Sequence, residues 1–158
     1  MDARFAFALA VCIGIVAGLR AVTAPAVVSW AARLGWLNLH GSPLAFMGST
    51  IATALFSLGA IGEYVNDKLP KTASRTAPPQ FIARVLMGGL SGACLCASAE
   101  ASLLLGALLG GLGAAVGTLG GYQVRTRLVR AFQAKDIFVA VPEDLVAIGF
   151  GLLLVSLG

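Results

Sequence analysis

The hydrophobic and polar residues of the chain fall into long separate blocks. Five apolar blocks are long enough, or nearly so, to cross the hydrocarbon core of a bilayer, which takes roughly 20 helical residues. These blocks cover residues 5–28, 44–64, 81–99, 102–122 and 138–157. The pattern predicts an all-α, polytopic transmembrane helical bundle with about five crossings, formed by a single domain over residues 1–158.

The first apolar block is interrupted near its outer end. Arg20 lies in the outer third of the block, and Pro25 follows five residues later. Proline removes a backbone donor and disfavours helix at the residue before it. We predict a kink or break near Pro25, followed by a second short helix over residues 26–35, whose tryptophans suit the outer lipid–water interface.

The composition supports lipid as the solvent of this chain. Of its 158 residues, 58% are hydrophobic and 11% are charged, and the mean hydropathy is +0.91. About a quarter of the residues of a soluble domain are normally charged, and disordered chains are poor in apolar residues. The net charge of +4 does not indicate nucleic-acid binding, because the bases lie between apolar blocks. The predicted partner is therefore the lipid bilayer.

The positions of the bases predict an orientation. If the N-terminus is cytoplasmic, the connections over residues 66–80 and 123–137 face inward, and nine of the eleven basic residues lie on that side. Such a bias is the usual mark of the cytoplasmic side. We predict five crossings, with the N-terminus inside and the C-terminus outside. A four-crossing count with the first block lying flat would reverse every later loop.

The glycines are spaced for close packing of helices. The chain has 20 glycines, and glycine lets helix backbones approach each other in membranes. Four-residue spacings join Gly14 with Gly18, Gly88 with Gly92, Gly106 with Gly110, and Gly113 with Gly117 and Gly121. We interpret these stripes as helix–helix contacts. The alternatives are a subunit interface in a homo-oligomer and a face along which a helix slides.

Arg20 is the most informative single residue. A charge well inside the hydrocarbon costs at least about 2.5–3.5 kcal/mol on insertion scales, and it is normally paired or hydrated. One interpretation is that Arg20 snorkels to the outer interface on its long stem. The other places it in a polar cavity beside the break, facing an anion or an acid of another helix.

The acids near the end of the second block also need explanation. Glu63 and Asp67 lie four residues apart and share one helix face, and Lys68 follows at once. Glu63 lies near a helix C-terminus, where the helix dipole disfavours an acid. Three arginines are candidate partners for Glu63, namely Arg75, Arg84 and Arg125. The alternative is a site for a cation or a proton.

The last apolar block contains a second acidic pair. Glu143 and Asp144 follow Pro142 directly. Proline at a helix entry and acids in the first turn are typical of a helix start. We interpret the pair mainly as helix capping, with a role in a binding site as the alternative.

The connection between the second and third blocks combines bases with hydroxyl groups. Its candidate residues are Lys71, Thr72, Ser74, Arg75 and Thr76. This chemistry suits a phosphate, including that of a lipid headgroup. The alternative is ordinary cytoplasmic positive charge with turn-forming residues. No Cys/His or Ser/His pairing, metal-ligand spacing or phosphate-binding loop is visible, so the sequence predicts neither a catalytic centre nor a cofactor.

Several stretches resemble a known family. In the first half of the chain they are Ala-Gly-Leu-Arg at 17–20, Thr-Ala-Pro at 23–25, Gly-Glu-Tyr-Val-Asn-Asp-Lys-Leu-Pro at 62–70 and Ser-Arg-Thr-Ala-Pro at 74–78. In the second half they are Gly-Thr at 117–118, Gly-Gly-Tyr at 120–122 followed by Arg125, and Glu-Asp at 143–144. In these stretches the chain resembles bacterial membrane proteins catalogued as domain of unknown function 4126. The resemblance covers nearly the whole chain. It implies a multi-pass protein of the bacterial inner membrane and supplies no established activity.

Two weaker patterns bear on mechanism. Glu63, Asp67 and Lys68 are similar to the Glu-x-Gly-Asp-Lys motif of small cation exchangers, although the spacing departs by one residue and the glycine is missing. On the predicted topology, the first two and last two blocks run in opposite directions around the third. This arrangement suggests an inverted repeat, from which many transporters are built.

We therefore predict a small transporter or channel-like homo-oligomer for a small ion or solute. In this hypothesis Arg20 binds or screens an anion from the outer side, while Glu63 and Asp67 bind a cation or relay a proton from the inner side. The remaining candidate site residues are Lys68, Arg75, Arg125, Glu143 and Asp144. The alternatives are a non-transporting scaffold or lipid-headgroup-binding module, and a membrane enzyme acting on a lipid phosphate.

Overall fold

Six α-helices and one short 3-10 helix account for most of the residues that the structure describes. The computed structural model describes residues 2–66, 77–132 and 137–158. The helices are α1 (Ala3–Leu19), α2 (Thr23–Arg33), η1 (Ala45–Gly48), α3 (Thr50–Asn66), α4 (Pro78–Ser98), α5 (Leu103–Phe132) and α6 (Ile137–Ser156). The described residues contain no strand, which confirms the all-α class.

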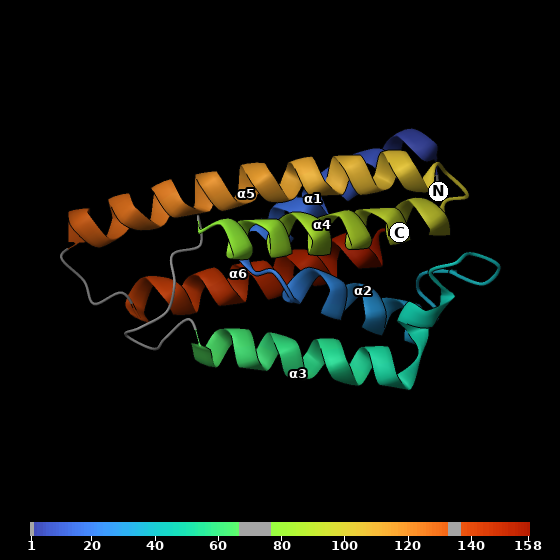
Figure 1. The fold of residues 1–158 in the computed structure, drawn as a ribbon, viewed down its shortest axis with the longest axis horizontal. Coiled ribbons are helices and arrows are strands. Elements are labelled where there is room, and N and C mark those ends of the chain that lie inside the picture. The colour runs from blue at the N-terminus through green and yellow to red at the C-terminus, as the bar shows by residue number, and fades with distance from the viewer. Residues whose placement is uncertain (1, 67–76, 133–136) are drawn as a thin grey trace.

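The predicted break in the first apolar block is confirmed, and it reverses the chain. Arg20 is extended, and a two-residue turn leads into α2. Pro25 lies in the first turn of α2, where its missing N–H is not needed. Val16 of α1 and Val27 of α2 both lie against Gly151 of α6, so the two helices fold back on each other (Figure 1). The first block is thus a helical hairpin rather than one kinked rod.

This extra reversal changes the placement of the chain ends. Both termini lie at the same end of the bundle (Figure 1). Ala6 packs against Cys96 near the end of α4, and Gly158 faces Leu95 of the same helix. The ends of α3 and α5 that flank the two basic connections lie at the opposite end. Two predictions are therefore wrong: that the N-terminus shares a side with the basic connections, and that the two termini lie on opposite sides.

The suggested inverted repeat is also wrong, for the same reason. It requires α1 and α5 to run in opposite directions. In the structure Val11 faces Gly113, and Ile15 faces Gly117, so the residue numbers of the two helices rise together. Parallel helices cannot be related by an inverted repeat of this kind.

Glycine-mediated packing is confirmed. Helices α1, α4 and α5 pack most closely on one another, and we call them the three-helix core. A Cβ atom on Gly110 would overlap the backbone of Gly88, and one on Gly14 would overlap the backbone of Gly110. Because helices of the same chain fill these faces, they no longer argue for a subunit interface, and the homo-oligomer stays a prediction. Helices α2, α3 and α6 form the outer layer below this core (Figure 1).

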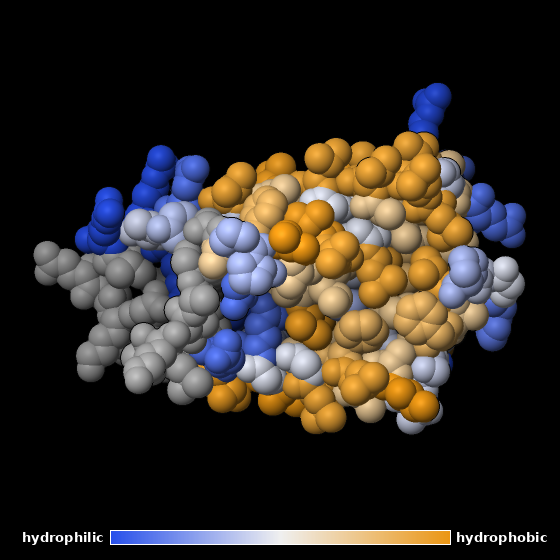
Figure 2. Space-filling view, in the orientation of Figure 1, coloured by the Kyte–Doolittle hydropathy of each residue, from blue (hydrophilic) through white to orange (hydrophobic). Residues whose placement is uncertain are grey.

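On the face shown in Figure 2, an apolar band lies between two hydrophilic ends. Large apolar side chains are exposed along it, among them Ile51, Leu58, Leu104 and Leu112. Among the described residues, two helical stretches are long and apolar enough to cross a membrane, Pro78–Ser98 and Leu103–Leu128. An exposed apolar surface of this extent is unusual for a soluble monomer and is typical of a protein in lipid.

Candidate functional site

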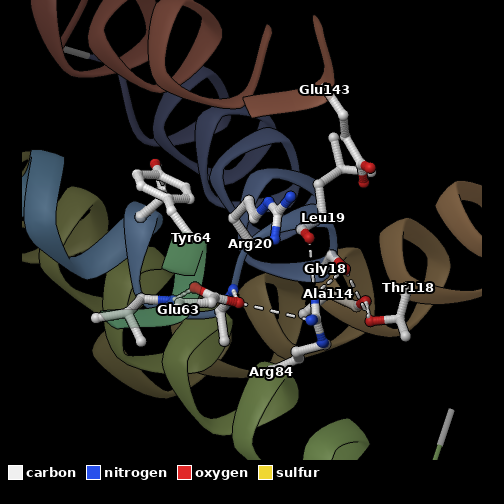
Figure 3. A network of polar contacts seen from close by, with 12 residues as sticks. Gly18, Leu19, Arg20, Glu63, Tyr64, Arg84, Ala114, Thr118 and Glu143 are labelled. Atoms are coloured by element: carbon white, nitrogen blue, oxygen red, sulfur yellow. Dashed lines mark hydrogen bonds and ion pairs between the residues drawn. The ribbon is translucent and has the colours of Figure 1, made fainter. Parts of the chain in front are cut away.

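The reversal between α1 and α2 creates a local problem of hydrogen bonding. The last carbonyls of α1 and the first N–H groups of α2 have no partner within their own helices. Arg20 and Thr23 are buried and the two turn residues between them are only partly exposed, and backbone groups away from water must be paired. Side chains of three other helices supply these partners (Figure 3).

Glu63 of α3 pairs with the start of α2. Its carboxylate accepts hydrogen bonds from the backbone N–H of Ala21 at 2.8 Å and from that of Val22 at 2.9 Å. Each donor binds a different carboxylate oxygen. The positive end of the α2 dipole also favours an acid at this point. The predicted need of Glu63 for a partner is confirmed, although the nearest donors are backbone groups.

Arg84 of α4 pairs with the end of α1. One guanidinium nitrogen donates to the carbonyls of Gly18 and Leu19, both at 2.8 Å. Thr118 of α5 donates to the Gly18 carbonyl at 3.2 Å. A cation is favoured at a helix C-terminus. The other terminal nitrogen of Arg84 lies 3.5 Å from Glu63 Oε1, so the partners of the two helix ends also form an ion pair.

Arg20 is fully buried at the tip of the hairpin, with 0% of its surface exposed. Its guanidinium forms an ion pair with Asp144 of α6. It also lies over the ring of Tyr64, 5.5 Å from the centroid, at a distance suited to a cation–π contact. The Tyr64 hydroxyl is 2.7 Å from the hydroxyl of Thr23. The snorkelling interpretation of Arg20 is therefore wrong, and the interpretation that it faces an acid of another helix is confirmed.

A third ion pair joins α5 to α6. Arg125 lies 3.4 Å from Glu143, and both side chains are largely buried. Helix α6 begins at Ile137, and Pro142 lies inside it. The capping interpretation of Glu143 and Asp144 is therefore wrong, because these acids lie beyond the first turn of the helix. They pair with arginines of other helices instead.

The three ion pairs share one arrangement. Every arginine comes from the three-helix core, and every acid comes from the outer layer. We call these six residues the charged layer: Arg20, Arg84, Arg125, Glu63, Glu143 and Asp144. Their charges sum to zero. Desolvation offsets much of the attraction within a buried pair, but removing one partner leaves an uncompensated buried charge. The charged layer therefore contributes more to how the three-helix core and the outer layer fit together than to the net free energy of unfolding.

The structure brings together five of the predicted site residues, namely Arg20, Glu63, Arg125, Glu143 and Asp144. Asp67, Lys68 and Arg75 lie outside the described residues, as do the headgroup candidates Lys71, Thr72, Ser74 and Thr76.

Sequence reasoning missed several members of this site. Arg84 was expected only as one of three partners for Glu63, and no role was predicted for Thr23, Tyr64 or Thr118. The available signal was Arg84 itself. A base inside the apolar block over residues 81–99 is as unusual as Arg20 is in the first block.

The described residues contain no group of three or more His, Cys, Asp or Glu side chains that could hold a metal ion. The Glu63 carboxylate, which the exchanger-like motif assigns to a cation, accepts hydrogen bonds through both oxygens. Among the described residues, the guanidinium of Arg84 forms an ion pair with it at 3.5 Å. The geometry thus assigns Glu63 to the helix break.

These observations define the class of the protein as an all-α helical bundle with an apolar belt and a buried charged layer at a helix break. Within that class, the chain belongs to the family described as Domain of unknown function (DUF4126), whose pattern matches residues 7–157. The resemblance noted from the sequence is confirmed. Comparisons with curated proteins and with solved structures give no match.

Proposed function

We propose that the protein is a small multi-pass transporter of the bacterial inner membrane that moves a small ion or solute through the charged layer. The observation that carries this proposal is the separation of charge across the layer. Three arginines of the three-helix core face three acids of the outer layer, beside a helix that reverses inside the bundle. Buried ionisable residues in a membrane bundle are rare and commonly mark a pathway for ions or substrates.

The hairpin revises the proposed orientation. Eight of the eleven bases lie in or beside the connections over residues 66–80 and 123–137, which join helices at one end of the bundle. The positive-inside rule places that end in the cytoplasm. Both termini then lie on the outer side, and the chain crosses as five long helices with α2 as a short returning segment. Arg84 lies roughly 9 Å into α4 at 1.5 Å per residue, so the layer sits inside the inner half of the bundle.

Broken helices have a known use in transporters. The N-terminus of a half-helix binds anionic groups of a substrate, and the C-terminus of a half-helix binds a cation. In this chain the carboxylate of Glu63 occupies the first position and the guanidinium of Arg84 occupies the second. The protein therefore closes both positions with its own side chains. Movement of the outer layer against the core would separate these charges and offer them to a substrate.

One observation favours a second function. Arg20 is fully buried, and the charges of the layer balance. Ion pairs that only hold the outer layer permanently on the three-helix core would show the same burial and the same balance of charge. In that case the protein is a non-transporting membrane scaffold, and the layer determines only its shape.

Flux through reconstituted vesicles separates the two functions. The purified protein would be placed in vesicles of phosphatidylcholine and phosphatidylglycerol, and entry of small solutes would be followed by osmotic swelling. We expect entry above that of protein-free vesicles, and its loss in Arg20→Ala. The matched control is Arg4→Ala, the same change at an exposed position at the far end of α1. If no solute enters faster than in protein-free vesicles, the scaffold is the better account.

A further inference from the structure

Helices α4 and α5 leave an apolar groove at the surface of the three-helix core. It holds about 580 Å³, and the described residues that line it are all apolar and come from these two helices. They include Phe81, Gly89 and Leu90 of α4, and Ala107, Gly111 and Ala115 of α5. We propose that the groove binds an acyl chain of an anionic phospholipid, whose headgroup lies at the basic end of α5. The groove shares no residue with the charged layer, so this site does not depend on the transport function.

Glycines form the floor of the groove, and leucines form its rim. Gly89 and Gly111 are buried where α4 and α5 meet, and a Cβ atom on Gly89 would lie 3.1 Å from the carbonyl oxygen of Ala107. Leu86 of α4 and Leu112 of α5 also line the groove, and each is 63% exposed. The two backbones therefore meet closely, while a long side chain of each helix extends outward beside the contact.

This construction favours an acyl chain over a helix of a second copy. Helix–helix contacts in membranes are enriched in small residues and in polar groups that hydrogen-bond across the contact. The small residues of this region already serve contacts within the chain, since Gly110 packs on both Gly88 and Gly14. The rim offers only branched aliphatic groups. Such groups contact a flexible methylene chain through dispersion, which needs no fixed partner geometry.

The length of the groove matches one leaflet of a bilayer. Phe81 and Leu90 are nine residues apart on α4, which is about 14 Å at 1.5 Å per residue. The hydrocarbon core of a bilayer is about 30 Å thick, so each leaflet contributes about 15 Å. Phe81 lies in the first turn of α4, at the end of the helix that follows the basic connection over residues 66–80. A chain that enters at this end would therefore fill the groove as far as the middle of the bilayer.

Helix α5 continues past the groove at the same end. The two helices run in opposite directions, and Gly110 packs on Gly88 (Figure 1). Pro78 lies ten residues before Gly88, so it is level with Gly120, ten residues after Gly110. Helix α5 runs on from there to Phe132, which adds about 18 Å. The headgroup region adds only about 5–7 Å to each side of the hydrocarbon core, so the start of this extension lies among the headgroups.

The extension presents an aromatic residue and two bases to that region. Tyr122 follows Gly111 by eleven residues, or about three turns, so it lies on the same side of α5 as the groove. Arg130 follows Leu112 by eighteen residues, or about five turns, and is placed in the same way. Arg127 lies between them along the helix, and both arginines are exposed. Helical side chains lean toward the N-terminus of their helix, which directs these bases back toward the groove.

The bases select the charge of the headgroup. Arginine binds phosphate through charge-assisted hydrogen bonds, and tyrosine is suited to the lipid–water interface. A zwitterionic headgroup carries its own ammonium group beside the phosphate. An anionic headgroup has no such group, so its charge is left for Arg127 and Arg130.

The test measures the binding of single lipids to the full chain in detergent micelles by native mass spectrometry. The probes are phosphatidylglycerol and phosphatidylcholine with the same palmitoyl and oleoyl chains. We expect the first phosphatidylglycerol to bind with a Kd about tenfold lower than that of the first phosphatidylcholine, because bases near a membrane surface attract anionic lipids. Equal Kd values for the two lipids would overturn the assigned headgroup.

Two phenylalanine variants test the groove. Ala115→Phe places a ring in the groove, whereas Val116→Phe places the same ring on the next residue, which is exposed and does not line it. Ala115→Phe is expected to raise the Kd of both lipids about tenfold, because the ring takes the place of the chain and its dispersion contacts. Val116→Phe should leave both values unchanged. Ala115 is partly exposed, so the ring does not enter the core.

Two double variants test the headgroup. Arg127→Ala with Arg130→Ala is expected to raise the Kd of phosphatidylglycerol to that of phosphatidylcholine and to leave the latter unchanged. Arg4→Ala with Arg33→Ala removes the same charge at the other end of the bundle and should change neither value. All four arginines are exposed, so both double variants keep the fold.

Three outcomes would overturn the proposal. Equal Kd values in Ala115→Phe and Val116→Phe would exclude the groove as the site of the chain. A preference for phosphatidylglycerol that survives the loss of Arg127 and Arg130 would exclude their role. A wild-type dimer that becomes a monomer in Ala115→Phe, but not in Val116→Phe, would assign the groove to a second copy. Transport is tested separately by the flux measurement, so each proposal can fail alone.

Discussion

Arg20 at the end of α1 and Asp144 on α6 form a buried ion pair that ties the tip of the α1–α2 hairpin to the outer layer. The pair joins an early segment of the chain to α6 and crosses from the three-helix core to the outer layer. Its geometry explains why an arginine is retained inside an apolar block. The guanidinium is held by an acid and an aromatic ring, and it does not reach either end of the bundle.

Removing one partner of this pair is expected to destabilise the protein more than removing both. Arg20→Ala removes the arginine from its buried ion pair with Asp144, and breaking such a pair from one side costs about 3–5 kcal/mol. Arg20→Met combined with Asp144→Leu replaces the pair by apolar groups and is expected to recover most of that loss. The measurement is the free energy of unfolding in detergent micelles. Equal losses in the single and double variants would show that the ion pair itself, rather than the unpaired charge, sets the stability.

Glu63 is expected to stabilise the start of α2 specifically. Glu63→Leu removes the acceptor for the N–H groups of Ala21 and Val22, and each buried donor left unpaired costs about 1–3 kcal/mol. Hydrogen exchange at these two amides should therefore become faster in Glu63→Leu, while exchange in the middle of α5 stays unchanged. Glu63→Gln keeps one acceptor oxygen and should show a smaller effect. Unchanged exchange at Ala21 and Val22 would contradict the assigned hydrogen bonds.

The sequence is sufficient to predict the class of the fold and the place of the break. Apolar blocks and spaced glycines are local features, and Gly14, Gly88 and Gly110 pack as their spacing predicts. The break at residues 20–22 lies just before Pro25, which is accommodated in the first turn of α2, where its missing N–H is not needed. These features depend on short-range sterics and solvation, which can be derived from neighbouring residues.

The direction of the chain after the break could not be predicted in the same way. An apolar helix has the same composition whether it continues outward or returns. The return of α2 is set by contacts with distant segments, such as Val27 against Gly151 and Ser29 with Thr53 of α3. One missed reversal then inverted the relation of the N-terminus to every later helix.

The site shows the same division between local and distant information. The charges of Arg20 and Glu63 mark them as unusual wherever they lie, because an ionised group in an apolar block needs a partner. The identity of that partner depends on which helices meet. From the sequence, Asp144 is interpreted mainly as a capping residue, and Arg84 is one of three candidate partners of Glu63. The packing of α4 and α6 determines the actual partner of each.

Close packing in the three-helix core gives a prediction with an internal control. A methyl group on Gly110 would overlap the backbone of Gly88, so Gly110→Ala forces α4 and α5 apart. We expect a loss of about 1–3 kcal/mol in the free energy of unfolding from such overpacking. Gly149→Ala on α6 meets nothing within 4 Å and should be neutral or stabilise by up to about 1 kcal/mol through helix propensity. Similar losses for both variants would mean that the helices do not touch at Gly110.

The helical hairpin predicts that both ends of the chain lie on one side of the membrane. A variant in which Cys12, Cys94 and Cys96 are replaced by alanine would carry one new cysteine at a time, at Asp2, Leu157 or Arg127. All three positions are exposed, the first two at the end of the bundle that holds the termini and the third near the end of α5. A membrane-impermeant maleimide added to intact cells should label Asp2→Cys and Leu157→Cys, whereas Arg127→Cys should react only in inverted vesicles, because the basic end faces the cytoplasm.

Labelling of Asp2→Cys and Leu157→Cys from opposite sides would require an odd number of crossings. That result would exclude the return of α2 and, with it, the pairing of Glu63 and Arg84 with the two helix ends.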